Sequence, residues 1–222
     1  MKITLLGTGT SQGVPVIACS CDVCLSDNQK DKRLRSSVMI EVDGQTIVVD
    51  TGPDFRQQML RDNVQKVDAI LFTHEHKDHI AGMDDVRAFN HKWKKDMEIF
   101  TTKRVGDALK REFHYVFSGD DCPAIPRVNI NTISNTPFKV NETEIVPIEV
   151  MHYKMPVFGF RIQNFVYITD VSYISEKEKE KIKVIFGHFG TSIRVVDKQT
   201  NVNQYIASQI SDQSLADNFH YC

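Results

Sequence analysis

Four side chains that readily bind metal ions are crowded into six consecutive residues of this 222-residue chain. They are His74, His76, Asp78 and His79, within the segment Thr73-His74-Glu75-His76-Lys77-Asp78-His79. Imidazole nitrogens and carboxylate oxygens suit borderline ions such as zinc. A single histidine is more often a surface or core residue, but three histidines and an aspartate in this order favour a metal site. The chain must therefore fold so that this segment faces further ligands.

The cluster follows Ala69-Ile70-Leu71-Phe72, a short apolar run that is typical of a buried strand. A turning backbone after a strand directs residues i and i+2 differently from a helix, so a loop here could serve two ions. His152 follows the strand-like run 144–150, and Asp170 follows 165–169. Strand ends at one sheet edge form a shared cleft, which favours both as ligands. In the alternative reading, His152 is a solvated loop residue and Asp170 caps a turn or helix.

The first two-thirds of the chain alternates short β-like runs with helical patterns, which predicts a mixed α/β fold. Asp43-Gly44 between two apolar runs predicts a tight hairpin, because both residues tolerate positive φ angles. Strands are predicted at 3–6, 37–42, 46–49, 69–72, 98–101, 128–133, 144–150, 158–162 and 165–169. Helices are predicted at 53–61, through Met83, Val86 and Phe89, at 103–113 and at 175–183, and a loop at 118–127. The length and the lack of a linker predict one domain over residues 1–222.

The charge balance gives no global reason to expect a nucleic-acid or membrane partner, because 27 basic and 29 acidic residues leave a net charge of −2. The apolar run at the start is too short for a signal peptide, and no later run is long enough to span a bilayer. We therefore expect a cytoplasmic protein. In that compartment its five cysteines would be thiols or metal ligands, not disulfides.

Cys19, Cys21 and Cys24 form a tight set of three thiols. Three thiolates and a histidine would hold a structural zinc ion and fasten an irregular loop that has little apolar content of its own. The competing reading is a redox pair at Cys21-x-x-Cys24, but no thioredoxin-like strand and helix surround it. Cys122 is expected to take no part.

Taken in order, Asp50, the His74 to His79 motif, His152 and Asp170 closely resemble the metallo-β-lactamase superfamily. Leu6-Gly7-Thr8-Gly9-Thr10-Ser11-Gln12-Gly13-Val14-Pro15, the three cysteines and Ala81-Gly82-Met83-Asp84-Asp85-Val86-Arg87 resemble its phosphonate-pathway phosphodiesterase group, which opens a cyclic ribose phosphate. The resemblance covers about residues 1–183. It implies an αββα sandwich with the site on one edge of two central sheets.

The resemblance also implies roles for individual residues. His74, His76 and His152 would hold one divalent ion, Asp78 and His79 a second, and Asp170 would bridge them. Two such ions, about 3.5 to 4 Å apart, would activate a shared water, so that the nucleophile is a metal-bound hydroxide. Asp78 would orient that hydroxide or accept its proton. The ligands admit zinc or manganese, and iron is a third option. The three cysteines, with a distant histidine, would hold the structural zinc.

The segment 184–222 departs from the superfamily pattern. The superfamily ends with a Thr-His-x-x-His-like element, whereas His188 and His220 are the histidines that follow Asp170 here and neither matches. Beyond about Gly187 the chain is rich in Asn, Gln and Ser, with a weak helical stripe of Val202, Ile206 and Ile210. One hypothesis is that residues from about Val184 come from a shifted frame or a truncated gene. The alternative is true divergence. An incomplete last part would leave an exposed sheet edge.

Three functions remain open from the sequence. The first is a phosphodiesterase that hydrolyses a small, cyclic phosphodiester, with a small phosphorylated molecule as its partner. The second is an ester, thioester or RNA-end hydrolase, since one fold serves many substrates. The third is an inactive metal-binding protein that lacks the last histidine ligands. A homodimer is compatible with each of these.

Overall fold

The predicted hairpin is present and forms the centre of a first β-sheet. Asp43 and Gly44 join its two strands with φ angles of 50° and 74°, the positive values that a tight two-residue turn needs. The computed structural model describes residues 1–119, 122–183 and 193–196. The strands of the first sheet, in spatial order, are β1 (Lys2–Gly7), β2 (Ser37–Val42), β3 (Gln45–Val49), β4 (Ala69–Leu71), β5 (Met97–Thr101) and β6 (Val128–Thr132). Pairing is antiparallel up to β3 and parallel from β3 to β6.

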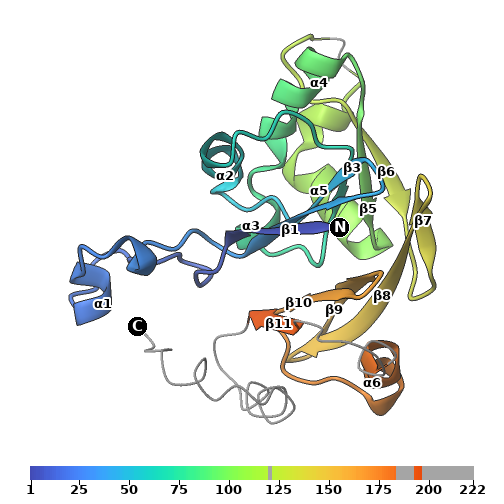
Figure 1. Cartoon of the computed structure of the whole chain (residues 1–222). Coiled ribbons are helices and arrows are strands. Elements are labelled where there is room, and N and C mark those ends of the chain that lie inside the picture. The colour runs from blue at the N-terminus through green and yellow to red at the C-terminus, as the bar shows by residue number, and fades with distance from the viewer. Residues whose placement is uncertain (120–121, 184–192, 197–222) are drawn as a thin grey trace.

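A second sheet lies against the first (Figure 1). Its strands are β7 (Phe138–Val140), β8 (Thr143–His152), β9 (Met155–Ile162), β10 (Phe165–Thr169) and β11 (Ile193–Val196), in the spatial order β11-β10-β9-β8-β7. β9 begins three residues before its predicted start, because β8 and β9 pair along their whole length from Ile145–Ile162 to His152–Met155. β7 and β11 were not predicted from the sequence.

Alternate side chains on the central strands face different layers, as strand geometry requires. On β2, for example, Val38, Ile40 and Val42 join the core between the two sheets, whereas Met39 faces the helices. On β10, Tyr167 lies in the core between the sheets and Ile168 faces outward. The apolar residues of these strands, which are buried on both faces, thus divide between two cores, and each fully buried aliphatic side chain contributes about 1.5–3 kcal/mol.

Helices cover the outer face of each sheet, which completes the predicted αββα sandwich (Figure 1). The α-helices are α1 (Asp22–Leu25), α2 (Phe55–Arg61), α3 (Lys77–Ile80), α4 (Arg87–Trp93), α5 (Lys103–Glu112) and α6 (Glu176–Lys183). The 3-10 helices are η1 (Gln29–Asp31), η2 (Met83–Val86) and η3 (His114–Phe117). The single helix predicted through Met83 and Phe89 is therefore wrong in detail: a 3-10 turn precedes α4, with the Arg87 N–H donating to the carbonyls of Asp84 and Asp85.

The Cys19–Cys24 segment lies on an arm that extends away from both sheets and carries α1 (Figure 1). The base of the arm is tied to α2, since the Arg35 guanidinium and the Asp54 carboxylate lie 2.9 Å apart. At the other end of the chain, β11 pairs in parallel with β10, so the expectation of an uncovered edge there is wrong for β10. The predicted helical stripe at Val202, Ile206 and Ile210, together with His188 and His220, lies outside the described residues.

Candidate metal centre

The histidine cluster meets His152 and Asp170 at one edge of the sandwich. The ligand atoms of His74, His76 and His152 all lie within 4.8 Å of one another, and so do those of His74, His79 and Asp170. His74 follows β4, His152 ends β8 and Asp170 follows β10. Two groups of potential ligands that share His74 thus form from strand ends far apart in the sequence.

The topology explains why these residues meet. The Phe158 N–H of β9 donates to the Thr73 carbonyl at 3.1 Å and joins the two sheets at this edge. Asp170, directly after β10, has a φ angle of 52°. This left-handed conformation is uncommon for residues other than glycine but tolerated by aspartate, and it turns the chain sharply at the strand end.

Asp170 belongs to the second group of potential ligands and lies close to His74, the residue that the two groups share. Its Oδ2 atom is 2.6 Å from His79 Nε2 and 3.5 Å from His74 Nε2. Asp78 Oδ2 is 3.4 Å from His79 Nε2, on the same side. Asp78 and His79 were predicted to lie in a loop, but they lie on the single-turn helix α3, with His76 in the extended position before it. Because His76 precedes this helical turn and His79 lies within it, the two side chains leave the backbone in different directions.

Beneath the ligands lies a layer of buried hydrogen bonds that the sequence analysis did not describe. Asp50 is fully buried, and its Oδ2 atom lies 2.7 Å from His79 Nδ1. Thr73 donates its N–H to Asp50 Oδ1 and its hydroxyl to Asp50 Oδ2. The Thr73 hydroxyl oxygen also lies 3.0 Å from His74 Nδ1. Both histidines are held through Nδ1, which leaves Nε2 directed at the site.

The signal for this layer was present in the sequence. Asp50 follows β3 and Thr73 follows β4, and these two strands are parallel neighbours. Because the carboxyl ends of parallel neighbours meet, polar residues directly after each of them come into contact. Sequence alone does not say which strands are neighbours.

The electrostatics of the site favour cation binding. Burial and the charge of His79 lower the pKa of His74 to about 2, so its imidazole is neutral at pH 7 with a lone pair to offer. Burial alone would raise the pKa of Asp170, but the hydrogen bond from His79 and the charge of His79 lower it to about 2. Converging imidazole nitrogens and a carboxylate anion are a donor set that fits divalent ions such as zinc or manganese.

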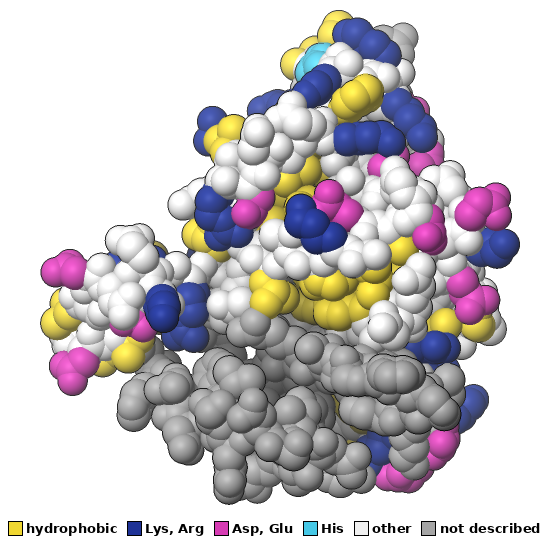
Figure 2. Space-filling model, viewed as in Figure 1, with side chains coloured by type: hydrophobic (Ala, Val, Ile, Leu, Met, Phe, Trp, Pro, Cys, Tyr) yellow, Lys and Arg dark blue, Asp and Glu magenta, His cyan; other side chains and the backbone are white. Residues whose placement is uncertain are grey.

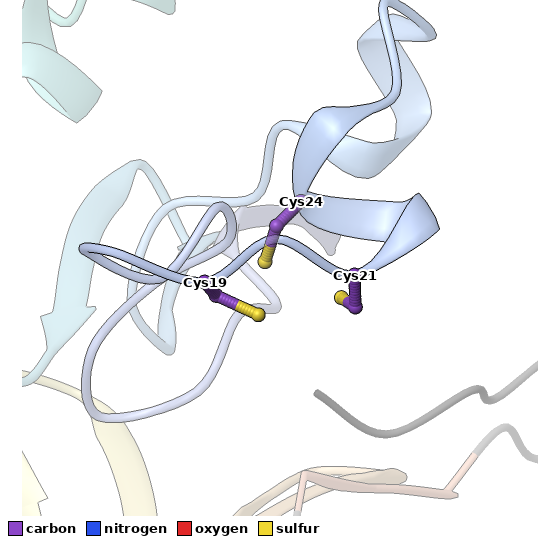
Figure 3. A group of neighbouring side chains, drawn as sticks. All are labelled: Cys19, Cys21 and Cys24. Carbon is purple, nitrogen blue, oxygen red and sulfur yellow. The ribbon is translucent and has the colours of Figure 1, made fainter.

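The three clustered cysteines also converge. Their sulfur atoms all lie within 4.8 Å of one another and point toward a common centre (Figure 3). Cys24 is buried, and its Sγ accepts a hydrogen bond from the Val16 N–H at 3.3 Å. Cys122 is exposed and lies outside this group. Three thiols at this spacing fit a tetrahedral zinc ion better than a disulfide exchange site.

The surface carries side chains of both charges, and the described helices do not suit a membrane. On the face shown in Figure 2, Lys and Arg side chains lie among Asp and Glu side chains, as expected from the small net charge. Within the described part of the chain, every helix is too short or too polar to cross a bilayer.

An αββα sandwich with such a histidine and aspartate cluster at one edge defines the metallo-β-lactamase class of fold. Comparison with known families agrees, because the model of the beta-lactamase superfamily domain matches residues 45–188. The chain belongs to this superfamily.

Two known proteins have more than 30% sequence identity with this chain. A solved structure described as a new diphosphatase from the PhnP family has 35% sequence identity and a TM-score of 0.74, over 81% of this chain and 69% of that one. An octanoyltransferase from Porphyromonas gingivalis is 37% identical over 82% of this chain. The match spans only 37% of that relative, so the activity in its name is not carried over to this chain.

A third relative shows the fold alone. The zinc-bound PqqB structure from Methylobacterium extorquens has a TM-score of 0.66 at 19% identity, over 82% of this chain and 69% of that one. Divalent metal binding is implied by the superfamily to which the chain belongs.

Proposed function

We propose that this protein is a metal-dependent phosphodiesterase that acts on a small phosphorylated substrate. The observation that carries the proposal is the position of Asp170, whose carboxylate lies 2.6 Å from His79 and 3.5 Å from His74, the histidine that the two groups of potential ligands share. A carboxylate in that position suits a pair of cations, and paired cations suit the cleavage of phosphate esters. The likeness to a diphosphatase of the PhnP family supports hydrolysis at a phosphorus centre.

Each ligand has a place in this proposal. His74, His76 and His152 would hold one divalent ion, Asp78 and His79 a second, and Asp170 both. Bound there, the ions would lower the pKa of water, neutralise phosphate oxygens and stabilise the leaving group. Zinc and manganese both suit these ligands. The three cysteines would hold a separate structural zinc.

The chain's own residues position the reaction. Asp78 retains 20% side-chain exposure and so can reach an incoming water, which it would orient or deprotonate. Burial raises the pKa of Asp78, but the hydrogen bond from His79 and the charge of His79 together lower it below its ordinary value, so Asp78 is anionic at pH 7. Asp50 and Thr73 fix the two buried imidazoles from below.

A second candidate is hydrolysis of a phosphoanhydride. It is favoured by one finding, the diphosphatase activity named for the relative with 35% identity. Both candidates need the same cations and the same attacking water, and they differ in the group that leaves. A comparison of substrates therefore distinguishes the two candidates.

The test is a hydrolysis panel on the full chain loaded with zinc or manganese. The substrates are the linear phosphodiester bis(p-nitrophenyl) phosphate, a 2′,3′-cyclic nucleotide, a diphosphate diester, a carboxylic ester and a thioester. We expect cleavage of the first two, which are phosphodiesters. The H152A variant should lose at least about 100-fold in kcat/KM, whereas H91A, at an exposed histidine on α4, should not.

Three outcomes would contradict the proposal. Cleavage of the thioester or carboxylic ester alone would assign a different bond, and cleavage of the diphosphate alone would favour the second candidate. Full metal loading without hydrolysis of any substrate would identify a metal-binding protein instead of an enzyme.

A further inference from the structure

The middle of the ligand-bearing segment is tied to α5 by two ion pairs. We call residues 74–79 the ligand loop. Glu75 and Lys77 come between the ligands His74, His76 and Asp78 in the sequence, but neither belongs to the two groups of potential ligands. Glu75 pairs with Arg104, and Lys77 pairs with Glu112.

The two pairs have opposite polarity. In the first pair the loop supplies the anion, Glu75, and α5 supplies the cation, Arg104. In the second pair the loop supplies the cation, Lys77, and α5 supplies the anion, Glu112. Arg104 and Glu112 lie eight residues apart on α5, about 12 Å along the helix axis, so the two pairs hold the loop at two separate points of the helix.

The Glu75 pair is more than a surface contact. Arg104 Nε and Nη2 both lie 2.6 Å from Glu75 Oε1, and the Glu75 side chain is only 18% exposed. Its second oxygen, Oε2, is buried and makes no hydrogen bond within the described part of the chain. Removing Arg104 would leave a largely buried carboxylate unpaired, which costs more than losing an exposed pair. Glu75 would then turn toward water and move the adjacent ligands.

The ends of the loop are fixed in another way. The Phe158 N–H donates to the Thr73 carbonyl, and the Thr51 N–H donates to the His79 carbonyl at 2.8 Å. Between these points, the carbonyls of His76 and Lys77 accept from N–H groups one turn later in the chain. The ion pairs to α5 thus act on the part of the loop that lies between its two backbone anchors.

We propose that Arg104 and Glu112 are positioning residues, which hold the ligand loop in the geometry that binds metal. The inference rests on the proposed metal centre but not on the reaction or its substrate. It predicts that substitutions of Arg104 and Glu112 alter metal affinity although neither residue touches an ion.

The experiment measures zinc and manganese affinity of the full chain by competition with a chelator, without substrate. We expect R104Q to weaken affinity about 3- to 10-fold, less than the loss seen when a direct partner of a ligand is removed. R104K should retain part of the affinity. E75Q/R104Q should recover part of the loss, because no buried charge is left unpaired. The matched control is the Lys103–Asp107 pair on the same helix, at 2.6 Å, and K103Q should bind metal like the unaltered chain.

A second readout needs no metal. Amide hydrogen exchange of the metal-free chain should be faster at residues 74–78 in R104Q and E112Q, and unchanged in K103Q. Equal affinities and equal exchange in all variants would overturn the inference. If no variant binds metal, the proposed function fails, and hydrogen exchange alone then decides whether α5 positions the loop.

Discussion

His79 Nδ1 lies 2.7 Å from Asp50 Oδ2, and both side chains are buried beneath the proposed metal centre. This carboxylate–histidine contact fixes the rotation of the His79 ring and so directs its Nε2 atom toward Asp170. Outer partners of this kind tune a ligand without touching the metal.

Replacing Asp50 by asparagine should therefore weaken metal binding while the shape of the side chain is kept. We expect about a 10- to 100-fold loss of affinity, as for other outer partners of histidine ligands. Chelator competition measures it. D96N removes an exposed carboxylate that pairs with Arg127 and should have no effect. Equal affinity of D50N and the unaltered chain would show that Asp50 does not act through His79.

A methyl group at Gly52 should displace the ligand loop. A Cβ atom there would lie 2.2 Å from the Asp78 carbonyl oxygen, a backbone atom that cannot turn away. We expect G52A to cost about 1–3 kcal/mol in the free energy of unfolding and also to weaken metal binding. The control is G106A in α5, where the nearest atom would be Ile130 Cγ2 at 3.4 Å and alanine improves helix propensity. If urea unfolding gave G52A the stability of G106A, the close approach would be unimportant.

Stability should depend on the ionisation of Glu178. Burial would raise the pKa of this carboxyl, but hydrogen bonds from Lys181, Asn135 and the Glu149 N–H lower it below its ordinary value. A lowered folded-state pKa stabilises the protein above the unfolded-state pKa, and this stabilisation is lost as pH falls through the folded-state pKa.

Glu178→Gln tests this dependence. We expect the variant to be less stable by about 1–3 kcal/mol at pH 7, and the difference from the unaltered chain to shrink toward pH 3. Urea unfolding across this pH range measures it, with E144Q on exposed β8 surface as the control. A difference that stays constant with pH would refute the assignment.

The cysteine arm should bind one zinc ion independently of the histidine site. Elemental analysis should find one zinc fewer per chain in C24S than in the unaltered protein, and no change in C122S. Proteolysis within residues 15–30 should be faster in C24S, because short elements such as α1 gain stability from metal binding. Zinc content that is unchanged in C24S would rule out this site.

Much of the fold was predictable because it follows from local patterns. The largely apolar runs of β2 and β10 indicate buried strands, and Asp43-Gly44 marks a hairpin whatever surrounds it. β7 was missed because only Val140 of its three residues is buried, which is too little to make a pattern. The helix through Met83 was predicted as one piece because periodicity does not distinguish a 3-10 turn from the first turn of an α-helix.

The sequence by itself determined the ligand types, their order and the superfamily that they indicate, because His74 to His79 are neighbours in the chain and their chemistry is local. Only the tertiary structure decided that Asp170 lies between His74 and His79, that Asp50 holds His79, and that Arg104 meets Glu75. The physical reason is that periodicity sets the face on which a side chain lies, whereas contacts across the sandwich depend on which strands and helices are neighbours.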